Sequence, residues 1–455
     1  ISSLTDEAIT EGMANLLPCD RFDNLFLAAD SRNRADWLLG VNSSYAICKA
    51  VGFGNNSLGR VQTPVLAEIC RRYRERENHM PADSWPVFIS LCKNDRILKM
   101  RHVDDLVVRR EALALYEDCK AAKSVRITAV GKRTEEIGAP ALYNLAELQK
   151  DANRYHSLTA IQVQEIAQGL YEKKLISYPR TSSRLLPKDV YDTLPPVMEK
   201  MLSRKEFRQY ADTVDLAAPR DSIEAQDTME HHAIIITGTQ PGKLDREEML
   251  VYTLIVGRML ETFMPPCKVE YTTVDTVCAA RKFRIRTYRI LEKGWLGIFE
   301  REHLVAKGCM PYLVMPDLFQ EEILPVAGCS LIHKKSLPVS PYTDEELVDY
   351  MDKAGLGTVS TRTNILRTLL ERKYIRYSGK YVVPTPKGLF LYETVRSMKV
   401  ADASLTSGWE TELARIERGE LSQEKFLDGV LETVNEVTGE IFRNHPVKKR
   451  QQGTT

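Results

Sequence analysis

A repeated segment is the feature that most limits how this chain of 455 residues can fold. Residues 170–178 (LYEKKLISY) and 369–377 (LLERKYIRY) are identical at five of nine positions, and a sixth exchanges Lys for Arg. Each segment ends a helical stretch and leads into a short extended one, and each comes after an earlier helical stretch. The order helix, turn, helix, strand resembles a winged-helix unit, so the sequence predicts two copies of a module that often binds nucleic acid.

Capping signals place the helices of both copies. Asn144 and Thr159 each stand three residues before a Glu or Gln, which is the pattern of a capping box, and they open the two helices of the first copy. Thr343 opens the first helix of the second copy, and its second helix is expected from about 361 to 372. The strand of the first copy is expected at 175–178.

The first 80 residues predict helices. Apolar residues recur closely enough between positions 35 and 41 to indicate a buried helix. They are Ala35, Trp37, Leu38, Leu39 and Val41. Residues 61–77 predict a long helix with one apolar face and arginines around it.

Strand-like stretches occur in the middle of the chain, on both sides of the first copy. Residues 87–100, 125–130 and 269–298 alternate apolar and polar side chains and are rich in β-branched residues. We expect these stretches to form one β-rich domain, interrupted by a helical insertion at about 141–237.

Composition excludes several classes of protein. The chain has 63 Lys and Arg against 62 Asp and Glu, so its net charge of +1 neither favours nor excludes a nucleic-acid partner. No apolar run approaches the ~20 residues of a membrane-spanning helix. Nine cysteines without one Cys-x-x-Cys pair exclude a zinc ribbon and a thioredoxin-like motif, and they fit a reducing cytosol. The chain starts at Ile1 without a signal peptide, so we expect a piece of a longer cytoplasmic protein.

The sharpest chemical motif is the segment 175–184 (LISYPRTSSR). Pro179 holds Tyr178 on an extended, stiff backbone, with Arg180 two residues further on. A tyrosine hydroxyl, with a pKa of ~10, is a weak nucleophile until a cation, metal or base activates it. A guanidinium can bind the charge that develops when the hydroxyl attacks phosphorus. Tyr178 and Arg180 are therefore a candidate nucleophile and stabiliser; the alternative is a strand tyrosine packed against a sheet.

A histidine pair, His231-His232, leads into a strand-like apolar run. An imidazole near a phosphate can donate a hydrogen bond to a nonbridging oxygen or move a proton. A metal site is the weaker interpretation, because adjacent histidines point apart and no third ligand stands at a familiar spacing. His231 is thus a candidate phosphate ligand, with a structural role as the alternative.

A small-residue turn at 57–64 (SLGRVQTP) opens the long basic helix. Backbone N–H groups at a helix start, with Arg60 beside them, suit a phosphate, although such turns are common. Residues 238–243 (GTQPGK) are one residue short of a P-loop, and Leu244 stands where a Ser or Thr would hold magnesium. We therefore reject an ATP site.

Taken in order, these segments resemble the type IA DNA topoisomerases, in particular the topoisomerase III branch. The matching segments are 30–42, 57–64, 175–183, 231–237 and 356–362, and together they span nearly the whole chain. The resemblance implies an ATP-independent enzyme that cuts one DNA strand, keeps the 5′-phosphate on a tyrosine, passes a strand and reseals the cut. The phosphotyrosine ester conserves the bond energy, so no ATP is needed.

The resemblance also assigns residues. Tyr178 would be the nucleophile, and Arg180 and His231 would assist at the phosphate. The residues expected to contact DNA are Arg32, Ser57, Arg60, Gln62 and Arg184. The expected partner is single-stranded DNA, the expected state is a monomer, and the expected location is the bacterial cytoplasm, at the nucleoid.

The family's toroid fits the interrupted order of the segments, so the expected fold is multidomain α+β. Residues 1–82 and 338–455 would form a helical base with one winged-helix-like unit. Residues 83–140 and 238–337 would form a β-rich arch and hinge. Residues 141–237 would form a winged-helix-like lid that carries the tyrosine.

Three departures from the family pattern are visible. The N-terminal TOPRIM domain, with its catalytic glutamate and its acidic ligands for Mg²⁺, should precede a segment like 1–9 and is absent, so this chain alone is expected not to relax supercoiled DNA. Ser182 stands where the family usually has Asp. Ile236 replaces a usual proline, which we expect to change only a strand end.

Two alternatives compete with the enzyme. The first is a noncatalytic module that binds single-stranded DNA through its two winged-helix units. The second is a relaxase-type nickase, which would need a His-x-His arrangement that His231-His232 does not provide.

Overall fold

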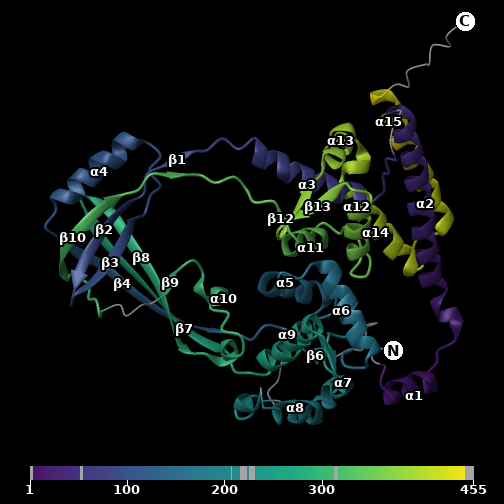
Figure 1. The fold of residues 1–455 in the computed structure, drawn as a ribbon, viewed down its shortest axis with the longest axis horizontal. Helices are drawn as coiled ribbons and strands as arrows, with labels where there is room; N and C mark the ends of the chain where they lie inside the picture. The colour runs from purple at the N-terminus through teal and green to yellow at the C-terminus, as the bar shows by residue number, and fades with distance from the viewer. Residues whose placement is uncertain are drawn as a thin grey trace, which may run out of the picture.

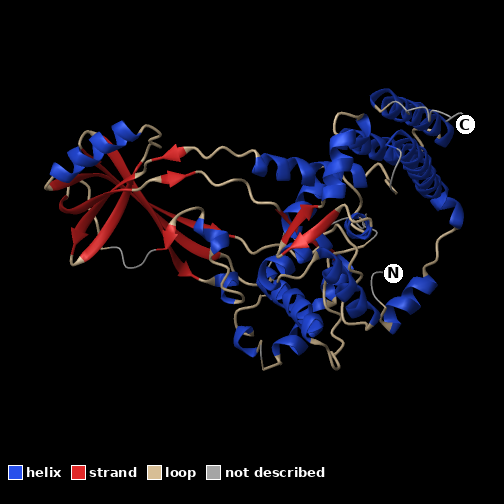
Figure 2. Cartoon of the chain, turned by 45° about the horizontal axis from the view of Figure 1, so that its top comes forward, coloured by secondary structure: helices blue, strands red, loops and turns tan. Residues whose placement is uncertain are grey.

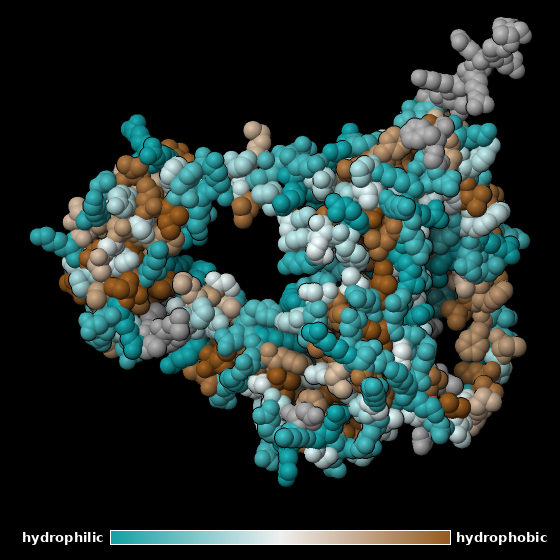
Figure 3. All heavy atoms as spheres, viewed as in Figure 1, coloured by the Kyte–Doolittle hydropathy of each residue, from teal (hydrophilic) through white to brown (hydrophobic). Residues whose placement is uncertain are grey.

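The elements of the chain form a ring around a central hole. The computed structural model describes residues 4–51, 55–205, 207–215, 223–224, 231–311 and 316–445. Figure 1 shows the arch at one end of the ring and the lid and base at the other. In the space-filling view of Figure 3 the hole is open and its border is largely hydrophilic. The predicted toroidal, mixed α+β architecture is therefore confirmed.

The arch is built on a sheet that closes on itself. Its strands are β2 (Val87–Lys93), β3 (Arg96–His102), β4 (Ser124–Ile137), β7 (Cys267–Cys278), β8 (Arg281–Glu292) and β10 (Ile323–Leu331). They run in the order β3-β2-β10-β4-β7-β8, and β3 pairs again with β8. Alternate residues such as Val87, Ile89 and Leu91 point into the core. Strand-like stretches that the sequence separates thus meet in one sheet, which Figure 2 shows as a cluster of strands with a helix lying over it, at the end of the molecule away from most of the helices.

Short elements complete the arch and its connections. They are β1 (Asp83–Ser84), α4 (Arg109–Ala121), η3 (Gly294–Gly297), α10 (His303–Ala306), β9 (Met310–Pro311) and β11 (Lys334–Lys335). Helix α4 covers the sheet with Ala112, Leu115 and Cys119. Strands β1 and β11 pair with each other where the arch joins the base.

The base combines both ends of the chain in one hydrophobic core. From the N-terminal part come α2 (Asp23–Val51) and α3 (Gln62–Glu77). The elements before them, α1 (Asp6–Ala14) and η1 (Cys19–Phe22), contribute no described residue to this core, and Asp6 in α1 pairs with Lys174 of the lid. From the C-terminal part come β12 (Tyr342–Thr343), α11 (Asp344–Lys353), α12 (Arg362–Glu371), β13 (Ile375–Ser378), β14 (Tyr381–Pro384), α13 (Pro386–Val395), η4 (Lys399–Ala401), α14 (Ala403–Glu417) and α15 (Gln423–Asn444). Helix α2 packs along α14 and α15.

The predicted buried face of α2 is only partly correct. Ala35 and Leu39 are buried, but Trp37 is 65% exposed and Val41 is 49% exposed. Positions 35 and 39 are one helical turn apart and share the core side, whereas 37 and 41 lie on another face. That second face lines a groove over the base.

The lid contains α5 (Leu145–His156), α6 (Ala160–Glu172), β5 (Leu186–Pro187), α7 (Lys188–Asp192), α8 (Leu194–Leu202), η2 (Arg208–Tyr210) and β6 (Ile223–Glu224). Helix α9 (Arg246–Thr262) packs in the same hydrophobic core, although the boundary predicted at residue 237 assigns it to the arch. The strand predicted at 175–178 is wrong: only an isolated bridge joins Ile176 to Ile236. Pro179 comes directly after Tyr178 and has no N–H with which to extend a ladder.

The two copies of the repeat correspond residue for residue at a constant spacing of 199. Lys174 and Lys373 (373 − 174 = 199) both adopt left-handed backbone, with φ of 61° and 59°. The carbonyl of each accepts a hydrogen bond from a threonine: Thr237 Oγ1 donates to Lys174 O at 2.5 Å, and Thr385 Oγ1 donates to Lys373 O at 2.6 Å. The repeat is therefore a repeat of structure.

The first elements of the two copies also correspond. Asn144 and Thr343 (343 − 144 = 199) cap α5 and α11, and each accepts the backbone N–H three residues later. Before them, Tyr143 bridges Ile234 as Tyr342 pairs with Val382. Each copy thus has the same small sheet, reduced to isolated bridges in the first.

The ring closes where the lid meets the base. Lys150 Nζ lies 2.8 Å from Asp349 Oδ1, and Ala160 N donates to Asp344 Oδ2 at 2.7 Å. Arg154 on the lid also pairs with Glu345 on the base. Among the described helices none is both long and apolar enough to cross a membrane.

Candidate active site and nucleic-acid groove

Hydrogen bonds fasten the segment that carries Tyr178 to the strand-like run after His231. Ser177 Oγ donates to Ala233 O at 3.0 Å and accepts Ile235 N–H at 3.0 Å. Thr181 Oγ1 donates to His231 O at 3.0 Å. Tyr178 lies between these anchors, so its backbone is held on both sides.

Two rings fix the side chain of Tyr178, which is half-buried. The centroid of the His231 ring lies 4.3 Å from that of Tyr178, with 47° between the ring planes. Tyr171, in the last turn of α6, approaches edge-on at 5.4 Å. The structure therefore brings together the two predicted residues that are far apart in sequence, Tyr178 and His231.

The two arginines that follow Tyr178 in the sequence differ in their hydrogen bonds. Arg180 is half-buried, and its Nε has no hydrogen-bond partner within the described part of the chain. Arg184 instead donates to two backbone carbonyls, Leu142 O and Ala141 O, each at 3.2 Å. The Arg180 Nε is thus buried and unpaired among the described residues, whereas the Arg184 guanidinium holds the start of the lid.

The two adjacent histidines have different surroundings. His232 is buried, its Nδ1 lies 2.7 Å from Ala233 O, and burial lowers the pKa of its imidazole. The ring of His231 lies against that of Tyr178 in a tilted arrangement. The pair therefore separates into one histidine beside the tyrosine and one that is part of the lid's packing.

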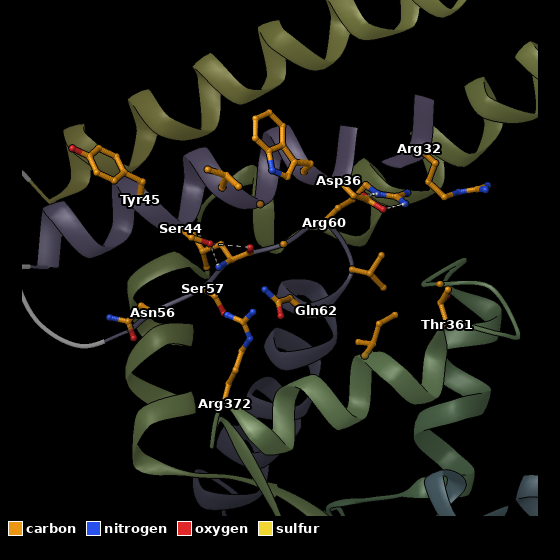
Figure 4. Close-up of a pocket in the computed structure, with 18 of the residues that line it drawn as sticks. Arg32, Asp36, Ser44, Tyr45, Asn56, Ser57, Arg60, Gln62, Thr361 and Arg372 are labelled. Carbon is orange, nitrogen blue, oxygen red and sulfur yellow. Dashed lines mark hydrogen bonds and ion pairs between the residues drawn. The ribbon is translucent and has the colours of Figure 1, made fainter. Parts of the chain in front are cut away.

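A groove of about 1010 Å³ runs over the base, between α2, the turn at 55–61 and α12. Its walls include all four of the predicted DNA-contacting residues that lie in the base: Arg32, Ser57, Arg60 and Gln62. Figure 4 shows these side chains around the groove together with Tyr45 and Arg372. The fifth predicted residue, Arg184, lies in the lid and does not line it.

Arg60 is held beneath the groove surface by two carboxylates. Its Nε donates to Asp36 Oδ1 at 2.7 Å and its Nη1 to Glu410 Oε1 at 2.8 Å, and its side chain is only 3% exposed. Glu410 also accepts from Arg32 at 2.7 Å. Burial alone would raise the pKa of Glu410, but Arg32 and Arg60 hold it below its usual value. Arg32, at 35% exposure, is the more accessible cation of the two.

Ser57 and Gln62 are positioned by the turn before α3. Ser57 is buried, and its backbone N–H donates to the hydroxyl of Tyr374 at 2.7 Å. Gln62 is the first residue of α3 and faces the groove. The second copy of the repeat therefore supplies, through Tyr374, the contact that shapes the groove turn.

Sequence reasoning missed several groove residues. They are Trp37, Tyr45, Arg372 and Glu410. A signal for two of them was present: Trp37, Val41 and Tyr45 stand four residues apart, which is one exposed helical stripe. The sequence holds no comparable signal for Glu410, because this residue is 378 positions away from Arg32, to which it is hydrogen-bonded.

Magnesium does not fit the described residues by themselves. They contain no group of three or more His, Cys, Asp or Glu side chains placed to hold a metal ion.

Comparisons with known proteins agree with this geometry. A family model described as "DNA topoisomerase" matches residues 20–428. DNA topoisomerase 3 of Bacillus licheniformis is 29% identical over 97% of this chain and 64% of its own length. DNA topoisomerase 1 of Methanocaldococcus jannaschii is 29% identical over 94% of this chain and 55% of its own length. The solved full-length topoisomerase I of Thermotoga maritima shares the fold, with a TM-score of 0.78 at 20% identity over 96% of this chain and 72% of that one.

The chain spans less than two thirds of the length of the first of these relatives, 64%. The match of the family model nevertheless extends over both copies of the repeat, the arch and the groove. The chain belongs to the type IA DNA topoisomerase family.

Proposed function

We propose that this chain is the tyrosine-bearing part of a DNA topoisomerase of the topoisomerase III branch, and that the whole protein cuts and reseals one DNA strand. Tyr178 Oη attacks the phosphorus, an Oη–P bond forms, and the P–O3′ bond breaks. The phenol proton ends on the 3′-oxygen, and the 5′-phosphate stays on the enzyme. One ester replaces another, so the reverse reaction reseals the strand without ATP.

One observation carries this proposal: the Tyr178 ring is clamped against His231 within a chain that belongs to this family. Clamping the ring fixes the direction of the hydroxyl, which favours a defined angle of attack. His231 would donate to a phosphate oxygen or move the proton, and Arg180 would bind the charge on the equatorial oxygens.

The groove supports single-stranded DNA as the substrate. Exposed Trp37 and Tyr45 offer faces for stacking of unpaired bases, and Arg32 and Arg372 offer charge for phosphates. Because Arg60 is buried between two carboxylates, we assign it the task of setting the position of Asp36 and Glu410. We assign Arg184 to the lid's framework, with any DNA contact made only when its carbonyl partners are released.

Type IA topoisomerases generally depend on Mg²⁺. We propose that the ligands lie on a TOPRIM domain outside the residues of this chain. The chain alone is then expected to bind single strands as a monomer without relaxing supercoiled DNA.

Covalent trapping tests the reaction. The full-length protein is incubated with a 3′-labelled single strand and quenched with denaturant, and we expect label to remain attached to protein. Tyr178→Phe should lose this adduct completely. Tyr377→Phe, the matched change in the second copy, should keep it. Binding of the strand without any adduct in the unaltered protein would favour the noncatalytic alternative.

A further inference from the structure

A buried carboxylate lies where the lid meets the base, outside the tyrosine site and the groove. Asp344, the first residue of α11 in the base, is 1% exposed. Burial raises the pKa of its carboxyl group. Removing a carboxylate from water is costly unless hydrogen bonds replace those lost to water. The groups that bond Asp344 therefore decide what this buried position achieves.

Asp344 accepts hydrogen bonds from both the base and the lid. The hydroxyl of Tyr377, in β13 of the base, donates to Oδ1 and Oδ2 at 3.0 and 2.9 Å. The backbone N–H of Ala160, the first residue of α6 in the lid, donates to Oδ2 at 2.7 Å. Tyr377 thus holds the carboxylate within its own domain, while the Ala160 N–H joins it to the lid.

The N–H of Ala160 needs an acceptor from outside its own helix, because the first N–H groups of an α-helix have no partner within it. Thr159 caps α6, but its side chain accepts the N–H two residues beyond Ala160. In α5 the matching N–H, that of Leu145, donates to Thr181 O inside the lid at 3.2 Å. Asp344 thus completes the start of α6 from across the ring, where its charge also meets the positive end of the helix dipole.

The other contacts across this joint are weaker. Three ion pairs also join the lid to α11 and α12, and all their side chains are partly exposed: Lys150–Asp349, Arg154–Glu345 and Glu165–Arg367. Exposed ion pairs contribute little, because water and salt screen them. Within the described part of the lid, Ala146 and Ala160 are the residues that belong to the hydrophobic core of the base, and two alanines bury little apolar surface. The buried, charge-assisted bond to Asp344 therefore stands out among these contacts.

We propose that the bond between Asp344 and the Ala160 N–H holds the lid on the base, and that its breaking sets how often the ring opens. When the lid lifts, water solvates both the carboxylate and the N–H, so the bond stabilises the closed ring without making it permanent. The role in strand passage rests on the proposed function, because a strand enters the hole only through an opened ring. The bond itself does not depend on the chemistry of Tyr178.

A thiol placed in the joint measures opening. Ala146 of the lid is 7% exposed and packs in the core of the base, so Ala146→Cys buries a thiol that a maleimide reaches when lid and base part. The intact chain is treated with N-ethylmaleimide without DNA, and peptide mapping by mass spectrometry gives the labelling rate at position 146. Cys70, buried in the same core, reports unfolding of the base in the same sample.

Two changes remove the same bond from opposite sides. Asp344→Ala removes the acceptor, and Ala160→Pro removes the donor at the first helical position, which proline tolerates. Thr159 already has the extended backbone, with ψ of 156°, that a following proline requires. Each change should speed labelling at position 146 by about tenfold or more, the effect of losing a hydrogen bond to a charged group, and leave Cys70 unlabelled. Both changes together should have no more effect than the larger single one, since they break one bond.

Ala403→Pro is the matched control. Ala403 is also the first residue of a helix, α14 in the base, and it too follows a residue with extended backbone. This change should leave the labelling rate at position 146 unaltered. Asp344→Asn keeps an oxygen that can accept the Ala160 N–H, so its rate should lie between those of the unaltered chain and Asp344→Ala.

Three results would overturn the proposal. The first is unchanged labelling in both Asp344→Ala and Ala160→Pro, and the second is a double variant in which their effects add. The third is labelling of Cys70 as fast as that of position 146 in all of these variants, which would assign the effect to loss of the base fold. Because no DNA is cut in this assay, its result is independent of covalent trapping by Tyr178.

Discussion

The two copies of the repeat place tyrosines at two pairs of matching positions, and only one pair has kept the same surroundings. Tyr143 donates to Asp151 and lies under the Arg258 guanidinium at 4.2 Å. Its counterpart Tyr342 donates to Glu68 at 2.6 Å and lies under Arg72 at 4.0 Å. The partners come from different helices, yet the arrangement is the same, which marks this pair as framework.

The second pair, Tyr178 and Tyr377, has diverged. Tyr377 donates to both carboxylate oxygens of Asp344, at 3.0 and 2.9 Å, and burial raises the pKa of its hydroxyl far above the ordinary value. At the position matching Asp344 the first copy has Leu145 (344 − 199 = 145), and His231 lies against the Tyr178 ring. Both tyrosines are half-buried, but the hydroxyl of Tyr377 is bonded to a carboxylate, whereas the ring of Tyr178 lies against a histidine.

The difference arises from the length of chain between each tyrosine and its partner segment. In the second copy a tight turn joins Tyr377 to Val382, its partner across the hairpin. In the first copy the residues between Tyr178 and Ile234 form a long insertion, which contains α7 and α8 and supplies His231. The copy with the longer connection is therefore the one whose tyrosine lies beside a histidine, and the copy with the tight turn is the one whose tyrosine is bonded to a carboxylate.

The largest expected effect is on strand cleavage, and it concerns His231, which has no counterpart beside Tyr377 in the second copy. His231→Ala in the full-length protein should slow strand cleavage by about 10²-fold or more, the usual contribution of a positioned acid–base group. Single-turnover cleavage of a labelled strand measures it. Affinity for an uncleaved strand should stay within about twofold; unchanged cleavage would remove His231 from the site.

The framework pair predicts the largest loss of stability. Arg258 is buried and bonds both Asp151 and the fully buried Glu261, for which Arg301 is the only other cation among the described residues. Arg258→Ala therefore removes one of the two cations that neutralise these carboxylates and should cost up to about 3 kcal/mol. Arg72→Ala, the matched change, removes a side chain that is 19% exposed, and should cost about 1–2 kcal/mol. Chemical denaturation of both variants checks the order. Equal losses of stability in the two variants would contradict the argument that the burial of the arginine sets the size of the loss.

The diverged pair predicts a smaller contrast, measured in the same way. Tyr377→Phe removes a donor from buried Asp344 and should lower the free energy of unfolding by about 1–3 kcal/mol. Tyr178→Phe removes a hydroxyl from a half-buried ring and should change it by less than about 0.5 kcal/mol. A destabilisation of Tyr178→Phe as large as that of Tyr377→Phe would make Tyr178 a framework residue too.

Local signals allowed much of this fold to be predicted from the sequence. The caps at Asn144, Thr159 and Thr343 are observed where the capping pattern placed them, because such bonds span only three residues. The prediction of a strand at 175–178 was wrong. The segment that pairs with it, at 234–236, follows a long insertion in the sequence, and the two segments are joined by a single isolated bridge.

The predicted site divides along the same line. Neighbours in sequence, such as Tyr178 and Arg180, could be grouped from the motif. His231 is a separate candidate from the histidine pair, and only the family resemblance joins it to the tyrosine. The ion pairs of Arg60 could not be predicted, since Asp36 and Glu410 join it through tertiary packing alone. Arg60, which the sequence placed in a turn suited to binding phosphate, is therefore buried between two carboxylates.

The smallest expected effect lies where the copies meet. Lys150 and Asp349 occupy matching positions (349 − 150 = 199) and pair with each other across the lid–base contact. Both are partly exposed, so the pair should contribute only about 0.2–1 kcal/mol and weaken with salt. Because nearby Glu147 and Lys353 also bond these residues, reversing one charge creates repulsion rather than a simple loss.

Charge reversal tests whether this contact holds the ring closed. Lys150→Asp should speed hydrogen exchange in α5 and α11 at low salt, and adding Asp349→Lys should restore slow exchange by re-forming the pair in the opposite sense. At high salt the exchange rates of the variants should become similar, because salt screens the charge interaction that makes them differ. Fast exchange that the double change leaves unrescued would show that the lid and base are held by packing, with Gln149, Ala160 and their partners carrying the contact instead of charge.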